Sequence, residues 1–455
     1  MKKDLTKGPV FQTLVLYSIP LIVTNLVSIL FHAADVTVLS LMSGDAAVAA
    51  VGACGPLITL LVTFFNGFAT GANVIVARRV GARDEEGVRR AVGTAMILGL
   101  SSGIILMVVA LIFSRKFLIW MNCQEDVLDM AVLYMQIYFL GMPATMLYGF
   151  VAAVLRASGD SVRPMVYMLV SGVVNVGLNV LFVGAFGLSV AGVAIATALS
   201  NLLSLILGLI ALLRSRGPCR IVKKYLRFEW GEFTAMLRIA VPTALGGLFF
   251  FVSNIFISAT VNAMSTDAMA ANAISGQFDN VIYSVGSAIA IAAMNMVGQS
   301  HGAKDLGRIK KAIGIGTVYA TVTSLALGVL FVLFAEPMLY ILTDSPSVVA
   351  IAKDRMTLLC LTYFITSIME VLGFSLRTLH RQTAVMVVSG ICGFGVRSAW
   401  TFFVYPLAPS LSMLYTSFAV SAGVAIVCYL FLVRGTFRRL KEAFAKEEAP
   451  VAVKL

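Results

Sequence analysis

The sequence predicts an all-α integral membrane protein with twelve transmembrane helices in two pseudo-symmetric six-helix bundles. Three observations predict this fold class: the composition, the recurrence of long apolar segments, and motifs shared by the two halves. Of the 455 residues, 59% are hydrophobic and only 12% are charged, and the mean hydropathy is +0.94. A soluble domain carries about 25% charged residues. The composition therefore indicates a chain that lies mostly in lipid.

Apolar segments of about 20 residues recur along the whole chain, and a helix of that length crosses the hydrocarbon core of a bilayer. The first segment is too long for a signal-peptide core and has no small-residue cleavage site behind it, so we expect a retained helix. The predicted spans are 10–36, 46–77, 90–113, 129–153, 164–186, 190–213, 234–262, 268–298, 311–334, 353–375, 383–405 and 410–433.

The formal charge of +12 follows from membrane topology. With a cytoplasmic N-terminus, the N-terminal segment, the loops after every second span and the C-terminal tail hold nearly all of the 34 basic residues. This is the positive-inside rule. It predicts cytoplasmic termini in the plasma (inner) membrane and argues against a nucleic-acid partner. The remaining basic residues are Arg115, Lys116, Lys353 and Arg355 on the opposite side, and Arg397 within a span.

Motifs of the first half recur in the second half at offsets of about 220 residues. The pairs are 42–49 with 264–271, 81–84 with 302–305, 89–93 with 310–314, and 171–179 with 389–397. We expect an N-terminal lobe at residues 1–222 with the first six spans and a C-terminal lobe at 223–455 with the rest. Because each lobe has an even number of spans, both lobes have the same orientation in the membrane. Transporters built from two such parallel repeats bind substrate between the lobes and alternate access by rocking one lobe against the other.

Two short loops, Gly81–Asp84 and Gly302–Asp305, occupy matching places in the halves. We expect the glycine to permit the tight turn and the aspartate to cap the following helix.

Among the acids that fall within predicted spans, we single out Asp35, Asp279 and Glu370. An intramembrane acid costs a few kcal/mol and usually faces a cavity, a partner or an ion. We expect Asp35 to hold a cation. Asp279 and Glu370 would line the substrate cleft or carry a second proton; alternatively, one pairs with Arg397 or lies near the surface.

His32 precedes Asp35 by one turn and would tune its protonation or simply hydrogen-bond a neighbour. Arg397 occupies the position equivalent to Asn179, so the second lobe is not expected to bind an external ion. We group His32 and Arg397 with Asp279 and Glu370 as cleft candidates.

Together, the paired halves, the Gly-Ala-Arg/Lys-Asp loops, the segment Leu155–Pro164, the segment Asn175–Asn179 and Asp35 resemble the multidrug and toxic compound extrusion (MATE) family. The resemblance covers essentially the whole chain. It implies twelve helices in two lobes and export of mostly cationic, amphipathic organic compounds, driven by inward flow of H⁺ or Na⁺.

The resemblance also implies a cation site in the N-terminal lobe, made of Asp35, Asn175, Asn179 and Thr197. All four offer oxygen atoms, which suit a hard cation such as Na⁺; a lone carboxylate among amides can equally carry a proton. Position 179 is often Asp in the family branch with this site, and the Asn found here favours a one-proton cycle. The seventh span lacks the Glu of the NorM-like branch, so the chain is closer to the DinF-like branch.

Other functions fit the sequence less well. A flippase or exporter of a lipid-like or specific metabolite substrate is the alternative within the same superfamily. Catalytic motifs and cofactor-binding loops are missing, so we expect a secondary active transporter and not an enzyme. The six cysteines have no disulfide or zinc spacing. The expected partners are a small amphipathic substrate, membrane lipids and the coupling ion, and one chain suffices as a functional monomer.

Overall fold

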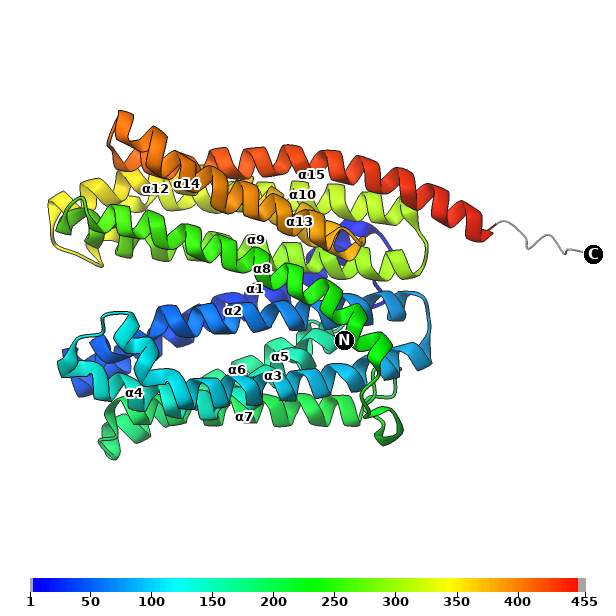
Figure 1. Cartoon of the computed structure of the whole chain (residues 1–455), viewed down its shortest axis with the longest axis horizontal. Coiled ribbons are helices and arrows are strands. Elements are labelled where there is room, and N and C mark those ends of the chain that lie inside the picture. Colours follow the sequence, from blue (N-terminus) through cyan, green and yellow to red (C-terminus); the bar gives the residue numbers. More distant parts are fainter. Residues whose placement is uncertain (1–2, 449–455) are drawn as a thin grey trace, which may run out of the picture. The chain divides into compact units, whose positions relative to one another are not determined.

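The computed structural model describes residues 3–448; the predicted cytoplasmic lysines Lys2 and Lys454 lie outside these residues. The described part of the chain consists of helices and connecting loops without strands (Figure 1). Within residues 3–448, eleven helices are long and apolar enough to cross a membrane, and a bent helix pair would make a twelfth span. The prediction of an all-α protein with many membrane spans is therefore confirmed.

The first half of the chain contains the following helices: α1 Val10–Ser43, α2 Asp45–Gly81, α3 Glu85–Trp120, α4 Glu125–Leu140, α5 Met142–Ala157, α6 Val162–Asn179, which continues as the π-helix η1 Val180–Ala185, α7 Ser189–Leu213, and the short 3₁₀ helix η2 Lys223–Tyr225.

The second half contains α8 Trp230–Asn262, α9 Thr266–Gly302, α10 Leu306–Leu333, α11 Ala335–Tyr340 and α12 Pro346–Thr378. It ends with α13 Gln382–Val388, the π-helix η3 Ser389–Val396, α14 Arg397–Ala399, the π-helix η4 Trp400–Val404, the 3₁₀ helix η5 Tyr405–Leu407, and α15 Leu411–Glu448.

Most membrane helices are longer than the spans drawn from the sequence. At 1.5 Å per residue, the 37 residues of α2 extend about 55 Å, whereas the hydrocarbon core is about 30 Å thick. Hydropathy therefore detects the part of the helix in lipid, and polar residues continue the helix beyond it.

The fourth span is broken. Its two helices, α4 and α5, meet at Gly141 with a bend of 46°. Pro143 lies in the first turn of α5, where its missing N–H costs no hydrogen bond. In contrast, Pro20, Pro56 and Pro242 lie inside helices that remain unbroken.

The chain forms two compact units. Unit 1 comprises the residues up to Asp4 and Ile19–Ala244; unit 2 comprises Leu5–Ser18 and the residues from Leu245 onward. Within unit 1, α5 packs against α2, α3 and α7, and within unit 2, α12 packs against α9, α10 and α15. Helices α1 and α8 therefore each contribute residues to both units.

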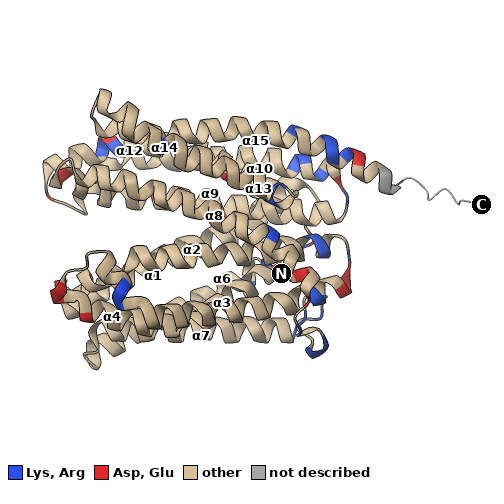
Figure 2. Ribbon diagram, viewed as in Figure 1, with Lys and Arg blue, Asp and Glu red and all other residues tan. Residues whose placement is uncertain are grey.

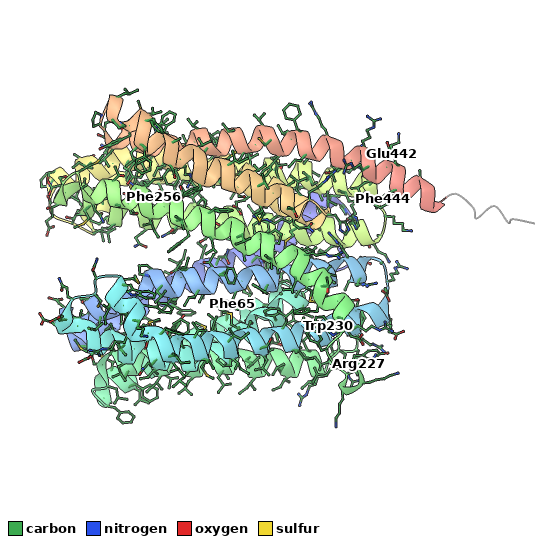
Figure 3. The ribbon with its side chains drawn as sticks, in the orientation of Figure 1. Phe65, Arg227, Trp230, Phe256, Glu442 and Phe444 are labelled. Atoms are coloured by element: carbon green, nitrogen blue, oxygen red, sulfur yellow. The ribbon has the colours of Figure 1, made fainter. Side chains whose placement is uncertain are left out.

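Within each unit, the lysines and arginines gather mainly at one end of the helices (Figure 2). In unit 1 this end includes Arg227 and Trp230 (Figure 3). Trp230 packs edge-on against Phe228 and Phe233, with ring centroids 5.0 and 5.7 Å apart. Tryptophan at such a place is typical of the membrane–water interface.

The two Gly-Ala-Arg/Lys-Asp loops have the same conformation. As predicted, the aspartates cap the next helices: Asp84 Oδ1 accepts from the Gly87 amide (2.9 Å) and Asp305 Oδ1 from the Arg308 amide (2.8 Å). The role expected of the glycines is wrong, because they are the last residues of α2 and α9. The left-handed backbone falls instead on Arg83 (φ 56°) and Lys304 (φ 59°).

Candidate functional site

The candidate ion site of unit 1 joins α1 to α6 through Asp35. The Asn179 amide Nδ2 donates a hydrogen bond to Asp35 Oδ1 over 2.5 Å, and it lies 3.4 Å from Asn175 Oδ1. Asn175 and Asn179 are buried, with 5% and 0% of their surface exposed, whereas Asp35 is half-buried. Because the asparagines are spaced i, i+4, they share one face of α6. Three of the four residues expected at the site are thus brought together.

The helix changes its winding at this site. Asn179 is the last residue of α6, and the π-helix η1 begins at Val180. π-Helical segments are rare and occur often at functional sites. In unit 2 the equivalent helix also winds as π-helix on both sides of Arg397, in η3 and η4.

A glycine sets the approach of α1 to α6. A Cβ at Gly172 would overlap the Phe31 ring. Phe31 lies one turn before Asp35 on α1, and Gly172 lies one turn before Asn175 on α6, so this contact fixes the register that lets Asp35 reach the amides. On its neighbouring side, α6 is held to α7 by a hydrogen bond of 2.6 Å from Ser204 to Ser171.

The site offers a carboxylate and amide oxygens, which fit a proton or a hard monovalent cation. The Asn179 Oδ1 atom is buried and has no hydrogen-bond partner among the described residues. Its amide nitrogen, and not this oxygen, faces Asp35. Coordination of a cation by Asn179 would therefore require rotation of the amide, whereas protonation of Asp35 requires only that the hydrogen-bond partner adjust.

Two expected neighbours form no hydrogen bond to this cluster in the described residues. Thr197 on α7 is partly exposed, and its carbonyl accepts a hydrogen bond from Ser200 (3.0 Å); it has no hydrogen bond to Asp35 or either asparagine in the described structure. His32 is exposed on α1, and within the described residues it forms no hydrogen bond with Asp35.

Two tyrosines near the site were not expected from the sequence. Tyr134 and Tyr138 on α4 lie close enough to Asp35 to interact with it electrostatically. Their rings stack with centroids 5.8 Å apart. The only sequence signal was their i, i+4 spacing, which is equally typical of a packed helix face.

In unit 2, Asp279 on α9 forms a buried ion pair with Arg355 on α12. The distance from Arg355 Nη2 to Asp279 Oδ2 is 2.7 Å, and each side chain is 7% exposed. Arg355 also donates to Ser275 (2.9 Å) and stacks over the Tyr415 ring at 4.6 Å. The alternative that Asp279 pairs with Arg397 is therefore wrong. Arg355 is the tenth residue of α12.

Glu370 on α12 is half-buried and has no hydrogen bond or ion pair within the described residues. It lies in electrostatic range of Arg377, two turns away on the same helix, and of Tyr283 on α9. Its carboxylate is thus less compensated than that of Asp279.

Arg397 is fully buried, with 1% of its surface exposed. Its Nε donates to Ser421 (2.9 Å) and its Nη1 to Asn254 Oδ1 (3.2 Å). The guanidinium carbon lies 4.7 Å from the Phe250 ring centroid and 4.1 Å from that of Phe418. Hence Arg397 is surrounded by neutral groups.

Comparisons with known proteins agree with this architecture. A model of the MatE family matches residues 20–181 and, a second time, residues 242–402. The double match agrees with the internal repeat found in the sequence. The probable multidrug resistance protein YoeA of Bacillus subtilis is 26% identical over 398 residues, which are 86% of each chain.

Solved structures show the same fold. A multidrug resistance MATE family transporter of the MOP superfamily, in an outward-facing conformation, superimposes with a TM-score of 0.89 at 20% identity, over 96% of this chain and 98% of the other. A MOP superfamily transporter from Pyrococcus furiosus, whose binding pocket is described as having reverse polarity, gives the same TM-score and coverage at 21% identity. Because the family model covers most of the chain, in two matching halves, the protein belongs to the MATE family of multidrug efflux transporters.

Proposed function

We propose that this protein is a proton-coupled antiporter that exports amphipathic, mostly cationic organic compounds, with Asp35 as the coupling acid. Asp35 alternates between a protonated state and a charged state that attracts a cationic substrate. The observation that carries the proposal is the contact of Asp35 with the Asn175–Asn179 pair, the only carboxylate–amide cluster that joins two membrane helices of unit 1 in the described residues.

A proton is the better-supported coupling ion, and Na⁺ is the alternative. The cluster holds one formal charge, and the Asn179 amide presents a donor to Asp35. A charged carboxylate accepts that hydrogen bond, and a protonated one remains neutral in lipid at low cost. Binding of Na⁺ would instead need the oxygens of Asp35, Asn175, Asn179 and Thr197 to converge, with the Asn179 amide rotated.

The proposed mechanism is alternating access between two six-helix lobes, residues 1–222 and 223–455, in one functional monomer. Both termini would be cytoplasmic and the chain would lie in the plasma membrane, as the distribution of basic residues suggests. The absence of an acid in 234–262 supports placing the chain closer to the DinF-like than to the NorM-like branch.

The proposal is tested in proteoliposomes loaded with ethidium. A pH gradient and a Na⁺ gradient are imposed separately on wild type, Asp35→Asn and the control Asp45→Asn, which removes an exposed acid at the start of α2. We expect efflux to follow the pH gradient in wild type and the control and to be lost in Asp35→Asn. Efflux by Asp35→Asn at the wild-type rate would overturn the proposal, and efflux driven by Na⁺ alone would replace the proton with Na⁺.

The second candidate function is export or flipping of a lipid-like or specific metabolite substrate. The neutral surroundings of Arg397 are the observation that favours it, because a buried cation without a counter-ion suits an anionic group.

A further inference from the structure

The charges buried in unit 2 do not balance around Arg397. Asp279, the acid first considered as its partner, is neutralised by Arg355 at 2.7 Å. Both hydrogen-bond acceptors of Arg397 are neutral, and no carboxylate pairs with it in the described residues. An uncompensated charge buried in a membrane protein is costly and is usually functional.

Arg397 uses only part of its hydrogen-bonding capacity within the described residues. Phe250 and Phe418 cover the planar group, Ser421 takes the Nε hydrogen, and Asn254 takes one hydrogen of Nη1. Nη2 has no acceptor among the described residues. A guanidinium presents its Nη1–Nη2 edge as a fork that matches the two oxygens of a carboxylate.

At the place in the internal repeat where unit 1 has its negatively charged ion site, unit 2 has the positively charged Arg397. Arg397 stands where unit 1 has Asn179, and at the offset of 222 residues between the starts of the two matched ranges Asp35 corresponds to Ile257. Ile257 is buried, with 4% of its surface exposed. Unit 1 thus combines an acid with amides, whereas unit 2 combines a guanidinium with an amide and a hydroxyl.

We infer that Arg397 is an anion-binding subsite that takes the carboxylate of an amphipathic molecule, with Phe250 and Phe418 beside the carboxylate and its apolar body. The inference deepens the proposed function, on which it rests for the view that the occupant is a transported molecule. It adds that molecules with a carboxylate on an aromatic or apolar body are ligands, and not cations alone.

The test measures binding of three naphthalene probes to the purified full-length protein by isothermal titration calorimetry at fixed ionic strength. The probes are 2-naphthoate, the neutral 2-naphthamide and the cationic 2-naphthylmethylammonium. The variants are Arg397→Gln and Asn254→Asp, which supplies a carboxylate beside Nη1 without changing the size of the side chain. Arg438→Gln removes an arginine that is 86% exposed in the same unit and is the matched control.

We expect wild type and Arg438→Gln to bind 2-naphthoate at least tenfold more tightly than 2-naphthamide, and both site variants to lose this preference. A wild type without the preference, or a folded Arg397→Gln that keeps it, would overturn the inference. If Arg397→Gln does not fold, Asn254→Asp provides the test: loss of the preference for 2-naphthoate supports the inference, and an unchanged preference overturns it. Binding needs no ion gradient, so this result is separate from the Asp35 efflux test of the proposed function.

Discussion

The buried pair of Asp279 and Arg355 gives the sharpest structural prediction. Removing one partner leaves the other charge buried, which typically destabilises a protein by about 3–5 kcal/mol. We expect this loss for Asp279→Asn and for Arg355→Gln, because each ionic partner is 7% exposed and the distance between the charged atoms is 2.7 Å. Ser275 and Tyr415 remain as partners of Arg355 in the first variant, so it should lie at the lower end of the range.

The double variant Asp279→Asn/Arg355→Gln should be less destabilised than the sum of the single variants, by about 2–3 kcal/mol. Two neutral amides can hydrogen-bond to each other, and no charge then remains buried. Unfolding in mixed micelles with rising mole fractions of SDS measures the four free energies of the cycle.

The exposed pair of Glu336 and Lys353, 2.8 Å apart, is the matched control. Lys353 holds the pKa of the Glu336 carboxyl below its usual value, by a hydrogen bond and by its charge. A lowered pKa means that any stabilisation is present at neutral pH and disappears on acidification. Because the pair is exposed, we expect Glu336→Gln to have little effect. If Asp279→Asn is equally harmless but abolishes ethidium efflux, Asp279 is a substrate acid and the reasoning fails.

Two further predictions concern packing. Gly172→Ala should clash with Phe31 and lower both efflux and thermal stability, whereas Gly177→Ala on the same helix has open space and should resemble wild type; equal behaviour of the two variants would refute the proposed role of Gly172. Arg308 donates three hydrogen bonds of 2.7–2.8 Å to main-chain carbonyls of the N-terminal segment. Arg308→Ala should therefore speed proteolysis before residue 10, unlike Lys310→Ala on the exposed side of α10, and equal cleavage would argue against this anchoring.

Much of the fold could be predicted because hydropathy and positive charge report directly on the membrane. The core of the site could be predicted as well: an acid inside a span is rare enough to stand out, and the spacing of Asn175 and Asn179 defines a helix face. The contact of Asp35 with these two asparagines depends on the approach of α1 to α6. That approach rests on the fit of Gly172 against Phe31, which has no periodic signal in the sequence.

The parts that could not be predicted depend on tertiary contacts. Arg355 lies near the edge of a predicted apolar span, so its burial could not be predicted from hydropathy. In the structure α12 begins nine residues before Arg355, and the arginine pairs with Asp279. The π-helical winding around Asn179 and Arg397 arises without a proline in η1 or η3. Positive φ at Arg83 and not at Gly81 shows that helix length, and not residue preference alone, decides where a turn falls.

The central claim is that substrate binding and protonation compete at Asp35. Ethidium is titrated into the purified protein in weakly buffered solution, and the protons released per bound ethidium are measured with a pH-sensitive dye. We expect wild type and the Asp45→Asn control to release about one proton per ethidium at a pH where Asp35 is protonated, since one carboxylate changes its charge, and Asp35→Asn to release none. Undiminished proton release by Asp35→Asn would contradict the account and move the coupling acid elsewhere in the chain.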